Sequence, residues 1–214
     1  METKATVFVV EDDPLVRQYI DLLLRAHSLN TETYPSAEDF LAAYDPSRPG
    51  CILLDIRLTG MSGLELQARL VKQHDSIPII FLTGFGDVES AVTALKAGAI
   101  DFIEKPIAEQ LLLDDVRLAL ERDAQTRRQQ VQIAECKHRI ALLTERQREV
   151  AVLLAAGRTM KQIASLLGLS EKTVQVHRAH VLEKLQIATI AELVRLWLAV
   201  EESTSVKTPP RNPI

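Results

Sequence analysis

Five polar residues follow or end short segments typical of strands in the first half of the chain. Glu11 and Asp12 follow ATVFVV, Asp55 follows CILL, Thr83 ends IIFLT and Lys105 follows DFIE. Carboxylate oxygens with few nitrogen ligands favour Mg²⁺ over zinc or copper. A divalent cation would relieve the repulsion between the acids and neutralise charge on an incoming phosphoryl group. These residue types therefore predict a Mg²⁺ (or Mn²⁺) site that can accept a phosphoryl group.

Asp55 is interpreted as the nucleophile of this site. None of these residues is a suitable general base for hydrolysis, so we expect Asp55 itself to become an acyl phosphate. Lys105 would place a positive charge on a phosphate oxygen, Thr83 a hydroxyl, and Gly84 an accessible backbone. A single aspartate after a strand is more often a turn or cap residue. The prediction therefore depends on all of these positions occurring together.

The elements that must position these residues alternate between strand and helix. The continuous apolar runs predict a parallel sheet covered on both faces, a doubly wound five-stranded (βα)5 α/β fold. Ligands of such open sheets bind at the carboxyl ends of the strands, where the polar residues above are placed. The expected strands are Ala5–Val10, Thr31–Tyr34, Cys51–Leu54, Ile79–Leu82 and Asp101–Ile103. Helices are expected from Pro14, after a Ser36 cap, over Gly63–Lys72, over Asp87–Lys96, and over 107–138.

The second half has a helical period throughout and a different charge. Residues 1–122 carry a net charge of −9 and residues 123–214 a net charge of +5. This asymmetry indicates two domains with different partners, the basic one suited to a polyanion. We expect an α/β domain over 1–122, a helical linker over 123–141, an all-α four-helix domain over 142–200 and a disordered tail over 201–214.

The four helices contain a helix-turn-helix pattern. Ala164 is small enough for a second helix to cross closely, Gly168 permits a left-handed turn, and Val174 returns an apolar side chain to the crossing. Thr144 with Gln147 predicts a capping box at the start of the domain. Ser170 is expected to cap the recognition helix, which would run to Leu185.

Composition narrows the functional classes. Cys51 and Cys136 form neither a disulfide framework nor a CxxC pair. The longest apolar runs are far shorter than the ~20 residues that a membrane span needs. His177 and His180 lack acidic or cysteine partners, so we expect no metal there. We expect a cytoplasmic protein without a membrane partner.

The segments VVEDDPLVR, CILLDIRLTGMSGLEL, PIIFLTGFGD and AVTALKAGAIDFIEKP resemble the receiver domain of two-component response regulators. The resemblance covers residues 5 to about 122. It implies that Asp55 is the phospho-acceptor and that Glu11, Asp12, Asp55 and the backbone carbonyl of Arg57 hold the metal. It further implies phosphoryl-binding and switch roles for Thr83, Gly84, Lys105 and the aromatic Phe102. Glu11, Phe102 and Phe85 replace the commoner Asp, Tyr and His without removing the chemistry.

The segment LTERQREVAVLLAAGRTMKQIASLLGLSEKTVQVHRAHVLEKL resembles the LuxR/NarL-type DNA-binding domain, and the whole chain resembles the FixJ branch. The resemblance implies that the recognition helix enters the major groove, with Gln175, Val176 and Ala179 facing base edges. Phosphate contacts or other outward-facing positions are expected at Lys161, Lys172, Thr173, Arg178, His180 and Lys184.

These features together predict a transcription factor switched by phosphoryl transfer from a sensor histidine kinase to Asp55. The phosphorylated receiver would form a homodimer that binds two-fold double-stranded DNA. The alternative is a phosphorylation-independent DNA-binding regulator with a vestigial receiver. A haloacid-dehalogenase-like phosphatase would need a second acid two residues after the nucleophile, where Arg57 stands. We therefore expect no dedicated enzyme, although phospho-Asp55 would hydrolyse slowly.

Overall fold

The computed structural model describes residues 4–84, 92 and 94–205. The chain divides into two compact units, Met1–Arg127 and Arg128–Ile214. The division falls within one long helix, α5, which runs from Glu109 to Ala141.

The first unit contains a five-stranded, all-parallel sheet with the strand order β2-β1-β3-β4-β5. This order confirms the predicted doubly wound architecture. The central strand β3 lies between β1 and β4, so residues after β1 and β3 emerge side by side. The strands are β1 Thr6–Val10, β2 Asn30–Tyr34, β3 Gly50–Asp55, β4 Ile79–Thr83 and β5 Asp101–Glu104.

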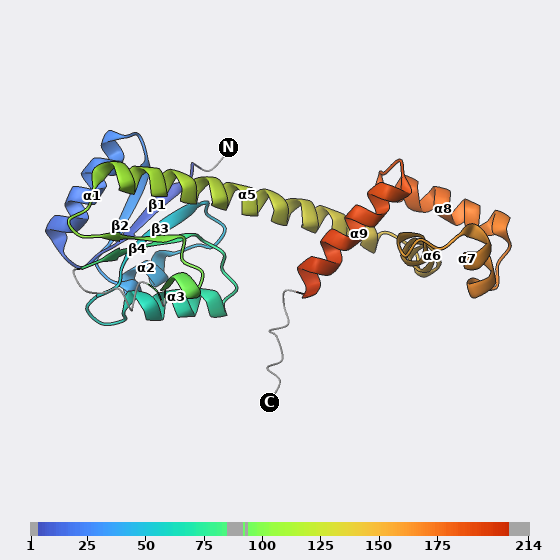
Figure 1. Cartoon of the computed structure of the whole chain (residues 1–214), viewed down its shortest axis with the longest axis horizontal. Helices are drawn as coiled ribbons and strands as arrows, with labels where there is room; N and C mark the ends of the chain where they lie inside the picture. The colour runs from blue at the N-terminus through green and yellow to red at the C-terminus, as the bar shows by residue number, and fades with distance from the viewer. Residues whose placement is uncertain (1–3, 85–91, 93, 206–214) are drawn as a thin grey trace, which may run out of the picture. The chain divides into compact units, whose positions relative to one another are not determined.

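Helices cover both faces of the sheet (Figure 1). On one face, α2 (Ala37–Ala43) and α3 (Gly63–Lys72) pack against alternate strand residues such as Phe8 and Leu54. On the other face, α1 (Pro14–Ala26) and α5 pack against the intervening residues, such as Val9. β1, β3 and β4 are buried along their whole length, which explains their continuous apolar sequences.

The loops at the carboxyl ends of the strands are held by local caps and one close approach. Ser36 caps α2 as predicted, and Ser62 forms a capping box with Glu65 at the start of α3. Gly63 packs directly on the end of β3, where an added Cβ would lie 2.2 Å from the carbonyl oxygen of Asp55. Glycine at this position therefore allows α3 to begin immediately behind the candidate nucleophile.

The helix expected over Asp87–Lys96 is described only in part. Residues 92 and 94–96 are helical. The expected start of this helix and Phe85 lie outside the described residues.

The first half of the long helix α5 is fastened to the sheet by a buried carboxylate. Asp123 is 3% exposed, and its Oδ2 accepts a hydrogen bond of 2.9 Å from the backbone N–H of Gly50 at the start of β3. Arg127 Nε lies 2.8 Å from the same oxygen, and its terminal nitrogens donate to the carbonyl oxygens of residues 46–48. α5 is thus held to the loop before the central strand.

The second unit is entirely helical in its described part. Its core consists of buried residues from all four helices that follow α5, among them Val150, Ile163, Val174 and Leu193. The helices are α6 Glu145–Ala155, α7 Met160–Leu167, α8 Glu171–Leu185 and α9 Ile190–Ser205.

The predicted helix-turn-helix is confirmed in its details. Thr144 and Gln147 form the expected capping box, and Ser170 caps α8. Gly168 ends α7 in the left-handed region, with φ of 64°, and allows α8 to follow after two residues. Ala164 is 7% exposed and Val174 fully buried at the crossing of the two helices.

The end of the second unit differs from expectation. The last helix continues to Ser205 instead of ending at Val200, so the prediction of a disordered tail was wrong for residues 201–205. The reason is that Glu201 and Glu202 are good helix formers and no proline occurs between positions 201 and 208. Residues 206–214 lie outside the described part.

Candidate functional site: an acidic pocket and an exposed recognition helix

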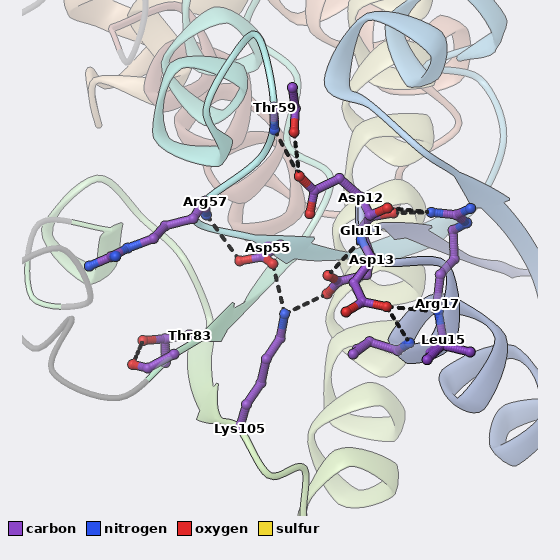
Figure 2. Close-up of polar contacts among 12 residues, drawn as sticks. Glu11, Asp12, Asp13, Leu15, Arg17, Asp55, Arg57, Thr59, Thr83 and Lys105 are labelled. Atoms are coloured by element: carbon purple, nitrogen blue, oxygen red, sulfur yellow. Dashed lines mark hydrogen bonds and ion pairs between the residues drawn. The ribbon is translucent and has the colours of Figure 1, made fainter.

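The predicted acids converge at the carboxyl end of the sheet (Figure 2). β1 pairs with β3, and this pairing brings Glu11 and Asp12 next to Asp55. One carboxylate oxygen from each of the three residues lies within 4.8 Å of the other two. Oxygen atoms at this spacing can bind one divalent cation together, and their hardness suits Mg²⁺.

Lys105 reaches this cluster from the end of β5. Its Nζ lies 2.7 Å from Oε2 of Glu11 and 2.7 Å from Oδ2 of Asp55. Burial acts to lower the pKa of Lys105, but the hydrogen bonds to Asp55 and Glu11 outweigh it and raise the pKa above its ordinary value. The ammonium is therefore a fixed positive charge beside the candidate nucleophile.

Glu11 is the most deeply buried acid of the group, with a side chain that is 1% exposed. Burial raises the pKa of Glu11 from 4.5 to about 7; the hydrogen bond from Lys105 opposes this effect and the charge of Asp55 adds to it. The removal of a carboxylate from water disfavours its charged form. A bound cation would again favour the charged carboxylate of Glu11.

Asp12 is held by a residue that the sequence did not single out. Thr59, in the loop after β3, donates to Oδ2 of Asp12 from its hydroxyl at 2.6 Å and from its backbone N–H at 3.0 Å. The Thr59 hydroxyl is the largest influence on the pKa of Asp12, which is lowered below its ordinary value. Asp12 is thus ionised and oriented.

The other predicted receiver residues surround Asp55 less closely. Asp55 Oδ1 accepts a hydrogen bond of 3.0 Å from the backbone N–H of Arg57, whose side chain extends away from Asp55 (Figure 2). The Thr83 hydroxyl donates to the carbonyl of Gly84 at 3.0 Å. Phe102 is 36% exposed on β5. The contribution of the Arg57 carbonyl to a metal stays a prediction.

Two further residues shape the acidic loop. Asp13, the next acid along the chain, caps α1 by accepting from the N–H groups of Leu15 and Val16. Arg17 donates from Nη1 to the carbonyl oxygens of Glu11, at 2.6 Å, and Asp12, at 3.2 Å. A positive charge near the start of a helix interacts unfavourably with the helix dipole. The position of Arg17 in the sequence is therefore a signal that its side chain has another partner.

An apolar groove borders the acidic pocket. It has a volume of about 380 Å³ and is flanked by unusually exposed apolar residues of α1: Leu15 is 76% and Tyr19 48% exposed. Lys105 contributes to the same groove. The lining residues are Leu15, Val16, Tyr19, Lys105, Pro106 and Ile107.

The recognition helix presents one exposed face. Val174, Val181 and Leu185 are buried in the second unit's core, and the opposite side of α8 is accessible. The spacing of three and four residues places the outward positions on one face of the helix. Lys172, Gln175, Val176, Ala179 and His180 are exposed there, as is Lys161 on α7, whereas Thr173 and Arg178 are half-buried.

Two of the predicted DNA-contacting residues have partners within the second unit. Thr173 is part of the α8 cap, where its N–H and hydroxyl contact the Ser170 hydroxyl. Lys184 Nζ donates to the carbonyl of Leu142 at 3.1 Å and to Oε1 of Gln147 at 3.0 Å. The ammonium of Lys184 is therefore already engaged by the residues that precede and cap α6. Its phosphate contact stays a prediction.

Within the described residues, no helix combines the length and apolar composition that crossing a membrane requires.

Comparison with known proteins identifies both units. Residues 7–117 match the family described as response regulator receiver domain, and residues 141–197 match the bacterial regulatory proteins of the luxR family. Nodulation protein W of Bradyrhizobium diazoefficiens is 42% identical over 91% of this chain and 86% of its own length.

Solved structures agree with this comparison. The response regulator StyR is 42% identical and superposes with a TM-score of 0.80, covering 91% of this chain and 98% of its own. Full-length FixJ from B. japonicum is 34% identical, with a TM-score of 0.58 over 94% and 98% of the two chains. The chain therefore belongs to the two-component response regulators, with a receiver domain followed by a LuxR-type helix-turn-helix DNA-binding domain.

Proposed function

We propose that this chain is a cytoplasmic transcription factor that is switched on when a sensor histidine kinase transfers a phosphoryl group to Asp55. The observation that supports this most strongly is the shared contact of Lys105 with Asp55 and Glu11. It combines a carboxylate nucleophile, a fixed cation and a cluster of oxygen ligands in one pocket.

Glu11, Asp12 and Asp55 would hold the Mg²⁺ ion, with the Arg57 carbonyl as a further ligand. When bound, Mg²⁺ (or Mn²⁺) supplies positive charge that offsets the negative oxygens of the transferring phosphoryl group. Asp12 is ready for this role because Thr59 keeps it ionised and oriented.

In the transfer itself, a carboxylate oxygen of Asp55 forms a bond to phosphorus while the phosphorus–nitrogen bond of the kinase phosphohistidine breaks. The imidazole leaves with the bonding electron pair. Lys105 exchanges its contact with the Asp55 carboxylate for one with a phosphoryl oxygen, so its charge remains paired throughout. The aspartyl phosphate later hydrolyses slowly, without making the chain a dedicated enzyme.

The apolar groove beside Lys105 would receive the kinase segment that presents the phosphohistidine. Leu15 and Tyr19 offer exposed apolar area, and Lys105, which contacts Asp55, also lines the groove. A partner seated there would bring its reactive nitrogen next to the nucleophile and exclude water from it.

Phosphorylation would be read out through Thr83, Gly84 and Phe102. The Thr83 hydroxyl, which now donates to Gly84, would turn to a phosphoryl oxygen, and the half-exposed Phe102 ring would move inward. The changed surface around β5 and the helix expected over Asp87–Lys96 would then join two receivers into a homodimer.

Two DNA-binding domains held together in this way would read a two-fold promoter site. Gln175 can pair with adenine, and Val176 and Ala179 can contact a thymine methyl group. Phosphate contacts are assigned to Lys161, Thr173, Arg178 and His180, with Lys172 as a further outward-facing cation, and to Lys184 where its ammonium leaves Leu142 and Gln147. Two half-sites supply the discrimination that a single small module lacks.

Light scattering and DNA binding, with and without beryllofluoride and Mg²⁺, test this function on wild type and Asp55→Asn. We expect a monomer that becomes a dimer, and binds DNA more tightly, only in the wild type. Equal DNA binding in all four samples would overturn the proposal and favour a phosphorylation-independent regulator.

A further inference from the structure

Thr59 makes two hydrogen bonds to a single oxygen of Asp12. Its hydroxyl and its backbone N–H donate to Oδ2 at 2.6 and 3.0 Å, and Figure 2 shows both contacts converging on that atom. The two residues lie at the ends of different strands, 47 positions apart in the chain. This is a contact between loops, not a local turn.

The loop that carries Thr59 is itself fastened. Two residues further on, the backbone N–H of Met61 donates to Oε1 of Glu38 on α2 at 2.9 Å. The carbonyl of Ile56 accepts from the N–H of Gly63, which closes the loop onto the start of α3. Thr59 is therefore placed by contacts that do not involve Asp12, and it can orient the Asp12 carboxylate.

Two donors on Oδ2 restrict the rotation of the Asp12 side chain and leave Oδ1 as the oxygen available to a cation. Ordering a side chain on binding weakens affinity, and an already ordered ligand avoids that loss. Hydrogen bonds from neighbouring residues to a metal-ligating carboxylate commonly change metal affinity tenfold or more.

We propose that Thr59 is a positioning residue for the Mg²⁺ site, which holds Asp12 in its ligating orientation before the ion arrives. The inference rests on the proposed function, because it assumes that the acidic pocket binds Mg²⁺. It adds that the affinity of this pocket depends on a hydroxyl outside the set of metal ligands.

Mg²⁺ alone, titrated into the full chain and followed by the ¹H–¹⁵N resonances of Arg57 and Lys105, tests the inference. Thr59→Val removes the hydroxyl at nearly constant volume, and Thr59→Ala removes it without a β-branch. In both variants we expect the Kd for Mg²⁺ to rise about tenfold. Thr59→Ser, which keeps the hydroxyl, is expected to bind within twofold of wild type.

Thr33→Val is the matched control, since Thr33 is an exposed threonine on β2 of the same unit. It is expected to leave the Kd unchanged. Thermal unfolding without Mg²⁺ should be the same for wild type, Thr59→Ser and Thr33→Val, and should occur at a somewhat lower temperature in Thr59→Val and Thr59→Ala, which lose a hydrogen bond to Asp12. The stabilisation by added Mg²⁺ should also shrink in these two variants.

A rise in Kd of less than threefold in both hydroxyl-deficient variants, or tighter binding, overturns the role of Thr59. Tighter binding would mean that the hydroxyl competes with the ion for Asp12. Failure of the wild-type protein to bind Mg²⁺ in the pocket would instead overturn the proposed function itself.

Discussion

The Lys105 ammonium and the Asp55 carboxylate, 50 residues apart in the chain, form an ion pair of 2.7 Å between the ends of two strands that are not neighbours. β4 lies between β3 and β5, so the long lysine side chain bridges over its end. The nucleophile is therefore already beside a cation before any phosphodonor arrives. The same cation occupies the oxygens that a metal ion would use.

Substitution of Lys105 should separate its role beside the Asp55 nucleophile from its competition with a metal ion. In Lys105→Met the aliphatic stem remains but the charge is removed, which leaves Glu11 and Asp55 without their shared partner. We expect Mg²⁺ to bind at least threefold more tightly, because it no longer competes with the ammonium. We also expect beryllofluoride to cause no dimerisation.

Mg²⁺ titration and light scattering on Lys105→Met and Lys105→Arg check this expectation. Lys105→Arg keeps the charge and is expected to keep wild-type Mg²⁺ affinity within about threefold. Weaker Mg²⁺ binding by Lys105→Met would contradict the competition between the ammonium and the ion.

The buried Glu11 gives the pocket a pH dependence. Burial raises its pKa from 4.5 to about 7, so the folded chain retains a proton that the unfolded chain has released across that interval. The free energy of unfolding should therefore fall as the pH rises from about 4.5 to about 7, and level off above it. Glu11→Gln, which cannot ionise, should lack this fall.

The affinity for Mg²⁺ should rise with pH over the same interval, because the ion must displace the proton from Glu11. We expect the apparent Kd for Mg²⁺ to be about tenfold higher at a pH one unit below 7 than in the plateau above it. Titrations at several pH values on wild type would reveal this slope. A Kd that is constant across the interval would show that Glu11 is ionised in the folded protein.

The strand-end residues were predictable because parallel strands impose their arrangement. Once the apolar runs are assigned to one sheet, the residues after β1, β3 and β5 must emerge at the same edge. The grouping of Glu11, Asp55 and Lys105 could therefore be predicted without knowledge of side-chain conformations. The caps at Ser36, Thr144 and Ser170 were predictable for a similar reason, since each depends on only three or four neighbouring residues.

Contacts between loops and those made by long side chains were not predictable. Thr59 meets Asp12 only because α2 and α3 fasten the loop after β3, and no local pattern encodes that position. Asp123 reads as an ordinary polar residue of a helical linker, yet it is buried against Gly50. Lys184 was expected to contact DNA because the sequence indicates its position on the helix. The sequence does not indicate the direction of its ammonium.

The Asp123 carboxylate should be important for stability. Asp123→Ala would leave the Gly50 N–H without its acceptor and Arg127 without its counterion, which we expect to lower the free energy of unfolding by roughly 2–4 kcal/mol. Asp114→Ala on the same helix is the control, since Asp114 is 57% exposed and its contacts with Arg117 and Gln110 lie at the surface. It should change stability by about 0.5 kcal/mol or less.

Urea unfolding followed by circular dichroism would measure both variants, and hydrogen exchange of the Gly50 amide would locate the effect. Exchange at Gly50 should accelerate in Asp123→Ala alone. Equal stability of the two variants would mean that the hydrogen bond from Gly50 contributes little.

Lys184 and Lys172 lie on the same helix and should respond differently to the same substitution. Lys184→Met removes two hydrogen bonds that link α8 to the start of α6, so we expect the second unit to become about 1 kcal/mol less stable. Lys172→Met removes an exposed charge and should leave stability unchanged within about 0.5 kcal/mol.

The salt dependence of DNA binding should change in Lys172→Met and not in Lys184→Met, the reverse of their effects on stability. The slope of log affinity against log salt should fall by about 0.9 for each phosphate that the protein no longer neutralises, and we expect this decrease for Lys172→Met only. A reduced slope for Lys184→Met at unchanged stability would show that its ammonium leaves Leu142 and Gln147 when DNA is present. In that case the phosphate contact inferred from its sequence position would hold for the bound state.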